Sequence, residues 1–240
     1  MANKYKAAMF DVGMTLIYPP LDEPFLDRLH DFGVDADIVE IGKALHFTDQ
    51  HFFKNYPGVL NRPVPEFYEY YASIMFAYLH IDKIEVHEFK KLMLEVSPPR
   101  SIWKVYPETL ECLGKLRDAG VKVGIFSNWD LSLRGLLDKM GITPYCDSIV
   151  VSSEIESEKP ASKGFLLGCE EMGVKPEECV YVGDNHRDDV LGGNAVGMDA
   201  LLLNRSDKPS GKTEGRFVEI KSLYDVVDIV TGKKCKKTKI

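Results

Sequence analysis

The sequence has no long apolar run, few cysteines and no excess of basic residues. No apolar stretch among its 240 residues approaches the ~20 residues that a membrane-spanning helix needs. The five cysteines are an odd number without a close pair in sequence, so neither a disulfide framework nor a zinc knuckle is expected. The formal net charge of −7 gives no general attraction to nucleic acid. We therefore expect a cytoplasmic protein that binds neither membranes nor nucleic acid, and the oligomeric state remains open.

Short β-rich runs alternate with helical segments over most of the chain. The runs that predict strands are residues 6–10, 122–126, 148–151, 179–182, 200–203 and 217–220. The segments that predict helices are residues 108–119, 131–140, 161–172, 189–196 and 223–230. Such an alternation is typical of a parallel sheet with helices on both faces. The sequence therefore predicts an α/β fold with a doubly wound, Rossmann-like sheet.

Residues 20–105 interrupt this alternation. The segment is rich in aromatic residues and is expected to form several helices. Apolar side chains recur in it at helical spacing, at Phe67, Tyr70, Tyr71, Ile74 and Tyr78, and these aromatic residues are expected to form a buried helical core. We therefore predict an α/β core made of residues 1–19 and 106–240, and an inserted helical domain made of residues 20–105. The lysine-rich residues 231–240 are expected to be a solvated tail.

Polar residues follow four of the predicted strands. In an open parallel sheet, ligands bind at the carboxyl ends of the strands, so these residues are expected to meet at one edge. In chain order they are Asp11 with Thr15, Ser127 with Asn128, Lys159, and Asp184 with Asp188 and Asp189. A helix cap or a turn accounts for any one of these residues, but poorly for the whole set.

The residue types in this set predict a phosphate site with a metal ion. Clustered carboxylates such as Asp11 and Asp184 repel each other unless a cation lies between them. Oxygen ligands on short side chains suit Mg²⁺ better than zinc. An ammonium group at Lys159 and a hydroxyl at Ser127 would neutralise and orient phosphoryl oxygens. A carboxylate can also be the nucleophile that forms an aspartyl-phosphate.

Four motifs in this order resemble those of the haloacid dehalogenase-like hydrolases. They are FDVGMTL at residues 10–16, IFSN at 125–128, EKP at 158–160 and VGDNHRDDVLGG at 182–193. Phe165 is also placed as in many phosphatase members of that family. The resemblance covers the first strand and nearly all of residues 107–203. It implies Mg²⁺ as cofactor, a small phosphorylated substrate, and a helical cap domain formed by the insertion.

The resemblance also implies roles for single residues. Asp11 would be the nucleophile and a metal ligand. The backbone carbonyl of Gly13 and the carboxylate of Asp184 would also bind the metal. Ser127 would hold the transferring group, and Lys159 would neutralise its charge. The remaining candidates of the motifs are Thr15 and Asn128, as catalytic residues, and Asp189, as a further residue of the metal site.

The first motif departs from the phosphatase pattern at Gly13. Phosphatase members usually have a second aspartate there, which protonates the leaving group and later activates water. Its loss removes a general acid–base, an effect on the order of 10²–10⁴-fold in rate. The first interpretation is a slow phosphatase, or one restricted to activated leaving groups such as acyl or aryl phosphates. His186 is a hypothetical replacement for the missing acid.

Other interpretations remain open. Haloacid dehalogenases also lack the second aspartate, but they have no acidic residue matching Asp184 and carry tyrosine where this chain has Phe165. Relatives of phosphonoacetaldehyde hydrolase use a lysine of the cap as a Schiff base, for which Lys43 or Lys54 would be candidates. A third class is a catalytically impaired protein that binds a partner.

Overall fold

The computed structural model describes residues 3–18, 27, 29–31, 37–56, 67–81, 103–206 and 209–232. The chain forms two compact units, Met1–Ile17 with Val105–Ile240, and Tyr18–Lys104. The second unit contains the helices α2 (Ile38–Asn55) and α3 (Phe67–Tyr78). A two-stranded sheet of β2 (Ile17–Tyr18) and β3 (Lys104–Val105) lies where the chain passes between the units. Most of the expected tail, residues 233–240, lies outside the described residues.

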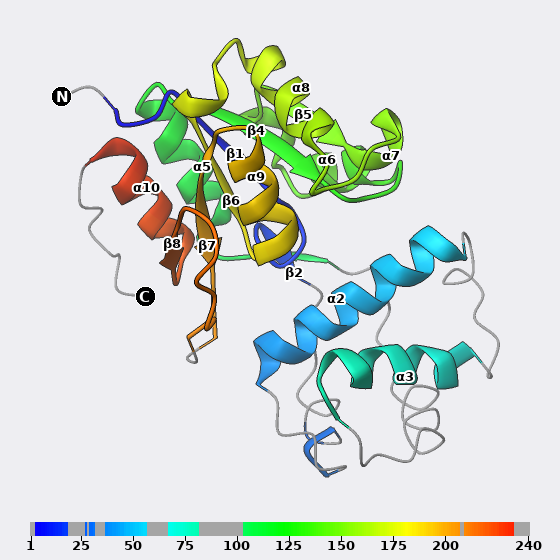
Figure 1. The fold of residues 1–240 in the computed structure, drawn as a ribbon. Coiled ribbons are helices and arrows are strands. Elements are labelled where there is room, and N and C mark those ends of the chain that lie inside the picture. The colour runs from blue at the N-terminus through cyan, green and yellow to red at the C-terminus, as the bar shows by residue number, and fades with distance from the viewer. Residues whose placement is uncertain are drawn as a thin grey trace. The chain divides into compact units, whose positions relative to one another are not determined.

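The first unit is built on a six-stranded sheet in the order β5-β4-β1-β6-β7-β8 (Figure 1). All five pairings between neighbouring strands are parallel. The strands are β1 (Ala7–Phe10), β4 (Lys122–Ser127), β5 (Ser148–Val151), β6 (Cys179–Gly183), β7 (Asp199–Leu203) and β8 (Phe217–Ile220). Strand β1 lies between β4 and β6, where all its residues are buried, which explains its wholly apolar sequence.

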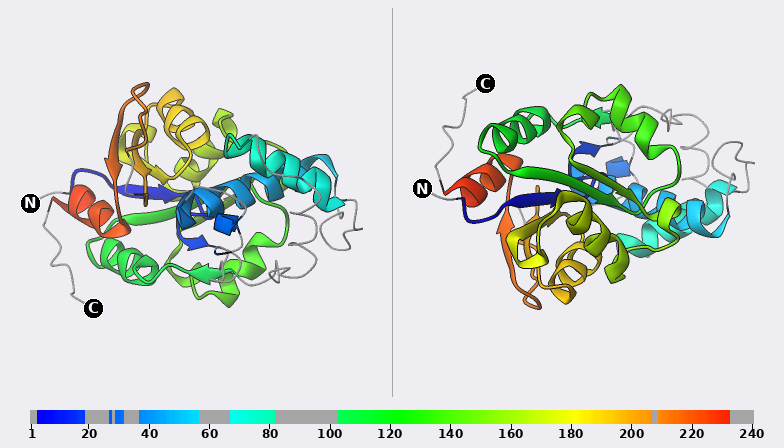
Figure 2. Two further views of the ribbon diagram at one scale, coloured as in Figure 1. Left: turned by 90° about the horizontal axis from the view of Figure 1, so that it is seen from below. Right: turned by 90° about the horizontal axis from the view of Figure 1, so that it is seen from above.

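Helices cover both faces of this sheet. Helices α5 (Thr109–Asp118) and α10 (Leu223–Thr231) lie on one face, and α8 (Ser162–Met172) and α9 (Gly192–Ala195) lie on the other (Figure 2). This arrangement confirms the predicted doubly wound α/β fold. The described part of this unit also contains the short helices α6 (Leu133–Lys139) and α7 (Ser152–Ile155) and the 3₁₀ helices Thr143–Tyr145 and Pro176–Glu178.

One predicted helix differs in its form. Where the sequence predicts a single helix over residues 189–196, the chain forms a π-helix, His186–Leu191, followed by α9. The π-helix begins earlier because Asn185 caps it. The Asn185 side chain accepts hydrogen bonds from the backbone N–H groups of Arg187 and Asp188, at 3.0 and 3.1 Å.

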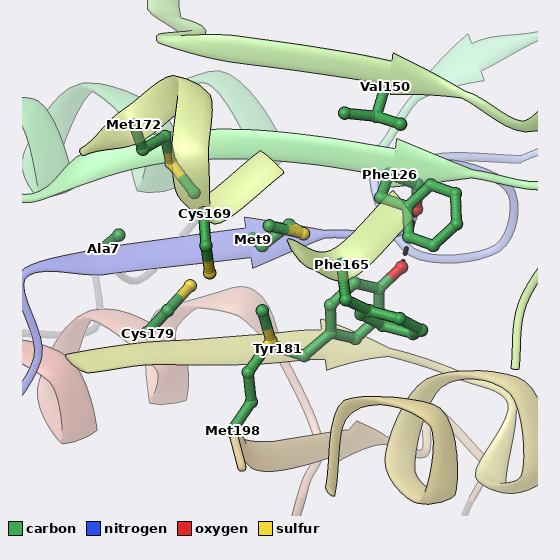
Figure 3. Packing of buried hydrophobic residues seen from close by; sticks show 10 residues of the cluster. All are labelled: Ala7, Met9, Phe126, Val150, Phe165, Cys169, Met172, Cys179, Tyr181 and Met198. Atoms are coloured by element: carbon green, nitrogen blue, oxygen red, sulfur yellow. Dashed lines mark hydrogen bonds between the residues drawn. The ribbon is translucent and has the colours of Figure 1, made fainter. Parts of the chain in front are cut away.

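Helix α8 packs unusually close to the sheet. A Cβ atom at Gly164 would lie 2.2 Å from the Phe126 ring, and one at Gly168 would lie 2.5 Å from the end of the Met9 side chain. The core between this helix and the sheet is rich in sulfur and contains Met9, Cys169, Met172, Cys179 and Met198 (Figure 3). Only glycine, which has no Cβ atom, allows the helix and the strands to approach each other this closely.

In the second unit, α2 begins with a capping box. Asp37 accepts hydrogen bonds from Val39 N–H and Glu40 N–H, and the Glu40 carboxylate accepts one from Asp37 N–H. On α3, Phe67 and Tyr71 are buried as predicted. The expected apolar face is wrong for two further residues, since Tyr70 is 69% exposed and Tyr78 is 40% exposed. Ala72, Met75 and Phe76 complete the buried face instead. Among the described residues there is no helix with the length and apolarity needed to span a membrane.

Candidate active site

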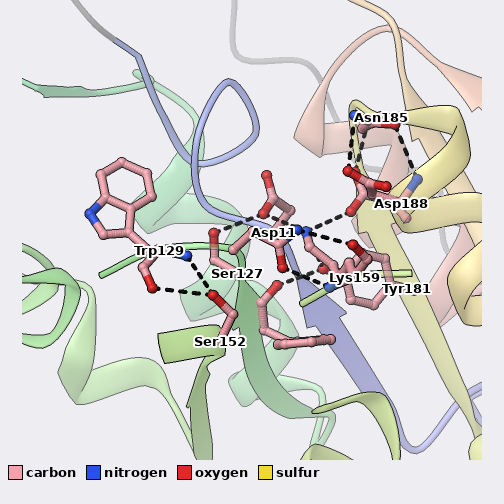
Figure 4. A network of polar contacts seen from close by, with 11 residues as sticks. Asp11, Ser127, Trp129, Ser152, Lys159, Tyr181, Asn185 and Asp188 are labelled. Carbon is pink, nitrogen blue, oxygen red and sulfur yellow. Dashed lines mark hydrogen bonds and ion pairs between the residues drawn. The ribbon is translucent and has the colours of Figure 1, made fainter. Parts of the chain in front are cut away.

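Most of the polar residues predicted near the strand ends meet at one edge of the sheet, where Asp11 contacts Ser127 and Lys159 (Figure 4). The Asp188 carboxylate is not part of the carboxylate cluster, and it accepts from Asn185 Nδ2 at 3.4 Å. Asp11 directly follows β1, Ser127 is the last residue of β4, and Asp184 directly follows β6. The N–H of Asp11 donates to the carbonyl of Val182 in the neighbouring strand at 2.9 Å. The register of the parallel strands therefore places these three residues at the same edge of the sheet.

The carboxylate of Asp11 is held by two donors. The Ser127 hydroxyl donates to Asp11 Oδ1 at 2.9 Å, and the Lys159 ammonium donates to the same oxygen at 2.7 Å. Asp11 is 6% exposed and Lys159 is 7% exposed. Charge-assisted hydrogen bonds in such a buried setting orient the carboxylate firmly.

Lys159 has three partners for its three ammonium protons. Besides Asp11, it donates to Asp189 Oδ1 at 2.7 Å and to the Tyr181 hydroxyl at 3.0 Å. Burial lowers the pKa of Lys159, but the charges of Asp11 and Asp189 more than offset this, so the pKa lies well above its usual value. The side chain is therefore a fixed positive charge at neutral pH.

Tyr181 belongs to this network although the sequence did not single it out. Its hydroxyl donates to the carbonyl of Phe126 at 2.6 Å, so it connects Lys159 to the backbone just before Ser127. Burial raises the pKa of Tyr181 well above its ordinary value. A tyrosine inside an apolar strand reads as a core residue. The available signal was that a buried tyrosine needs a hydrogen-bond partner.

Asn128 contacts the backbone of Lys159. Its side-chain oxygen accepts from Lys159 N–H at 2.7 Å, and its Nδ2 donates to the Lys159 carbonyl at 3.2 Å. This pair of bonds joins the loop after β4 to the loop that carries the ammonium group. Asn128 therefore contacts the backbone of Lys159 rather than its ammonium group.

Three carboxylates of the site lie close together. One oxygen each of Asp11, Asp184 and Asp189 can be chosen so that all three lie within 4.8 Å of one another. Burial raises the pKa of Asp189 to about 7, and the charges of Asp11 and Asp184 add to this, although Lys159 acts in the opposite direction. A divalent cation would relieve this repulsion. The oxygen donors therefore fit a hard ion such as Mg²⁺.

Gly183 makes room for one of these carboxylates. A Cβ atom there would lie 2.1 Å from Asp189 Oδ2. The same oxygen accepts a hydrogen bond from Asn185 N–H at 2.8 Å. The conformation of the π-helix and the missing side chain at residue 183 together place Asp189 in the site.

His186 is turned toward another part of the chain. Its Nε2 lies 2.7 Å from the carbonyl oxygen of Glu214, and its ring contacts Phe217 edge-on at 5.5 Å between centroids. These contacts give no support to the hypothesis that His186 replaces the missing acid. Lys43 lies on α2, whereas the Lys54 side chain lies outside the described residues, so both Schiff-base hypotheses stay untested.

The loop after Asp11 is a tight turn. The carbonyl of Val12 accepts from the N–H groups of Thr15, Leu16 and Ile17, at 3.3, 2.9 and 3.1 Å. Gly13 is buried and forms an isolated bridge with Ile17. Thr15 is fully buried, and its hydroxyl has no hydrogen-bond partner among the described residues. Gly13 therefore gives this turn no acidic side chain.

Comparison with known proteins shows the family to which the chain belongs. Residues 5–197 match the family model described as haloacid dehalogenase-like hydrolase. The chain is 33% identical to a glyceraldehyde 3-phosphate phosphatase of Methanopyrus kandleri, over 53% of this chain and 57% of that protein. It is 27% identical to a ribulose-1,5-bisphosphate 5-phosphatase of Halopiger xanaduensis, over 84% of this chain and 86% of that protein.

The fold is also similar to solved structures. A phosphatase from Thermococcus onnurineus, whose crystal structure is known, matches with a TM-score of 0.57 and 26% identity, over 96% of this chain and 100% of that one. Dehalogenases are also among the similar proteins. The match to the Methanopyrus phosphatase spans little more than half of that protein.

Proposed function

This chain belongs to the haloacid dehalogenase-like hydrolase family, and on that premise we propose that it is a Mg²⁺-dependent phosphatase of a small phosphorylated substrate. The observation that carries the proposal is the Asp11 carboxylate. Ser127 and Lys159 hold it from one side, and it lies beside the carboxylates of Asp184 and Asp189. We further propose that the protein is cytoplasmic, where such substrates are found.

In the proposed reaction, Asp11 is the nucleophile. One carboxylate oxygen attacks phosphorus, and the bond from phosphorus to the leaving oxygen breaks with its electron pair on that oxygen. Water then cleaves the aspartyl-phosphate, which releases inorganic phosphate and restores the carboxylate. The Ser127 hydroxyl would donate a hydrogen bond to a phosphoryl oxygen, and Lys159 would neutralise the charge that this group carries.

The metal would be held by the carboxylates of Asp11 and Asp184 and the backbone carbonyl of Gly13, with Asp189 close by. When bound, Mg²⁺ supplies positive charge against the phosphoryl oxygens. Asp189 would keep Lys159 oriented through the 2.7 Å ion pair between them. Thr15 would act through the turn that carries Gly13, and Asn128 would act through the backbone of Lys159.

Gly13 sets a limit on the substrate. Because this residue has no acidic side chain, the leaving oxygen departs without a proton from this position. Acyl and aryl phosphates have leaving groups stable enough for that, whereas alkyl phosphates do not. The related phosphatases are named for sugar phosphates, which supports a small phosphorylated substrate. Those sugar phosphates are alkyl esters, so the restriction to activated leaving groups rests on Gly13 alone. We propose that residues 20–105 form a cap that excludes water and selects the substrate.

The test is a phosphate-release assay with Mg²⁺ on one aryl and one acyl phosphate. We expect turnover by the wild type, none after chelation, and a loss on the order of 10⁴-fold or more in Asp11→Asn. Gly13→Asp should add activity on alkyl phosphates. A matched control is Asp130→Asn, which changes a partly exposed carboxylate that caps a turn at Ser132 N–H.

Two other outcomes would replace the proposal. Release of halide from a 2-haloacid would indicate a dehalogenase, an activity against which the acidic cluster at Asp184 argues. Phe165 also argues against it, because the dehalogenases carry tyrosine at this position; the Phe165 ring is fully buried, and its centroid lies 4.9 Å from those of Phe126 and Tyr181. A protein that binds Mg²⁺ but is inert on every substrate would indicate a binding or regulatory role.

A further inference from the structure

Arg205 lies outside all four motifs, on the loop after β7, yet it contacts the loop that follows the proposed nucleophile. One guanidinium nitrogen, Nη2, donates to the carbonyl of Thr15 at 3.1 Å, and Nη1 donates to the Glu108 carboxylate at 2.6 Å. The guanidinium group also lies 3.6 Å from the centroid of the Tyr106 ring. The planar guanidinium group thus donates to a carbonyl and to a carboxylate, and it also makes a cation–π contact with an aromatic ring.

The ion pair between Arg205 and Glu108 is largely buried. The side chains are 13% and 11% exposed. The carbonyl of Leu16, next to that of Thr15, accepts from Tyr106 N–H at 3.1 Å and from the Thr109 hydroxyl at 2.8 Å. Two consecutive carbonyls of the turn are therefore held by groups from distant parts of the chain.

The turn needs such support because its backbone is strained. Met14 has a φ of 58°, in the left-handed region that a side chain with a Cβ rarely adopts. Conformations of this kind persist only where the surroundings impose them. Arg205 contacts this turn at the carbonyl of Thr15, the residue after Met14 and two positions after Gly13.

Arg205 is itself held in place by its neighbours. The Asn204 side chain donates to Glu219 Oε1 at 2.9 Å and accepts from Ser206 N–H at 3.2 Å. Lys221 donates to the Ser206 carbonyl at 2.8 Å. The segment that carries Arg205 is therefore tied to the end of β8 on both sides of the arginine.

We propose that Arg205 is a positioning residue that keeps residues 12–16 in the conformation that presents Asp11 and the Gly13 carbonyl to the metal. This inference rests on the proposed function. Asp11 precedes the turn and Gly13 lies within it, so a relaxed turn would displace both groups. Lysine could keep a positive charge beside Glu108. It lacks the planar set of donors with which arginine binds Glu108 and the Thr15 carbonyl at the same time.

The experiment compares Arg205→Lys, Arg205→Met and the double variant Arg205→Met/Glu108→Gln. The double variant avoids a buried unpaired carboxylate and so guards against unfolding. The matched control is Arg117→Met, because Arg117 also donates to two backbone carbonyls, those of Pro144 and Tyr145, but in an exposed position. The readouts are kcat on an aryl phosphate, the Mg²⁺ concentration at half-maximal activity, Tm, and amide hydrogen exchange at residues 12–17 without metal.

We expect the double variant to lose about 10²-fold in kcat and to need more Mg²⁺, as a displaced reacting group would. Exchange at residues 12–17 should accelerate, Arg205→Lys should lie between it and the wild type, and Arg117→Met should match the wild type. A lower Tm with unchanged kcat, Mg²⁺ requirement and exchange would overturn the inference. If the wild type is inert, the proposed function fails, and the exchange measurement still decides whether Arg205 holds the turn.

Discussion

The two ends of the parallel sheet are made of the same strands but have opposite chemistry. Strand β6 begins at Cys179, within a core that is rich in methionine and cysteine, and ends at Gly183, beside the carboxylates. Strand β1 likewise carries Met9 within this core and is followed by Asp11 (Figures 3 and 4). Tyr181 lies between the two regions and contributes to both.

The side chains at the two ends of the sheet are held in different ways. Methionine side chains are unbranched and flexible, so the sulfur-rich core can adjust to a change of shape. At the other end, each polar group is fixed by its partners, as the three bonds of Lys159 show. We therefore expect the core to tolerate substitution better than the polar end, except where helix and strand backbones approach each other.

The largest effect on stability is expected at that close approach. Gly164→Ala would place a Cβ atom against the Phe126 ring, at 2.2 Å before any adjustment. Overpacking of this kind costs about 2–3 kcal/mol. The control is Gly135→Ala on α6, where nothing lies within 4 Å and the helix should gain about 1 kcal/mol. Denaturant unfolding measures both values, and equal effects at the two glycines would contradict the close packing.

The next largest effect is expected at Tyr181. In Tyr181→Phe, the carbonyl of Phe126 loses a donor and Lys159 loses an acceptor, both in a buried site. The expected loss is about 1–2 kcal/mol in the free energy of unfolding, together with a lower kcat. Tyr224→Phe is the control, because that hydroxyl donates to the surface carboxylate of Glu111. A phenylalanine at 181 without any cost would show that the network is not rigid.

A smaller effect is expected in the sulfur-rich core. Met172→Leu keeps the apolar volume beside Gly124 and should cost less than about 1.5 kcal/mol. Denaturant unfolding gives this value, and activity should not change. A loss as large as that in Gly164→Ala would mean that this core is as closely fitted as the polar end.

The smallest effect concerns pH. Hydrogen bonds from Ser210, followed by those from Asn204 and Lys221, lower the pKa of Glu219 to about 2. The unfolded chain has a pKa of about 4.3 for this group, so the ionised Glu219 stabilises the fold above that pH and ceases to do so as pH falls toward 2. The stability difference between the wild type and Glu219→Gln should therefore shrink between pH 6 and pH 3, as denaturant unfolding would show. A difference that stays constant would contradict the lowered pKa.

The sequence predicts the parts of this molecule that depend on strand ends. Asp11, Ser127, Lys159 and Asp184 could be brought together because parallel strands share one carboxyl edge. Most of the strands were recognisable because buried parallel strands are short apolar runs; the edge strand β8, which contains Glu219, is largely not buried. The second unit was predicted less well, since Tyr70 and Tyr78 have the spacing of a buried face but are exposed.

The missed features depend on contacts between distant residues. Tyr181 resembles any core residue of a strand until its hydroxyl is seen between Lys159 and Phe126. Arg205 belongs to no motif. Its contact with Thr15 depends on the assembled sheet, in which β6 lies between β1 and β7. Periodicity along the chain contains no information on such pairs.

The central position of β1 in the sheet has a consequence for folding during synthesis. Ala7 pairs with Lys122 on one side and with Cys179 on the other, so β1 leaves the ribosome well before either of its partner strands. Such long-range pairing is slow and leaves an apolar strand exposed meanwhile. We therefore expect production of this protein in a cell to depend on chaperones that shield β1 until β4 and β6 have been made.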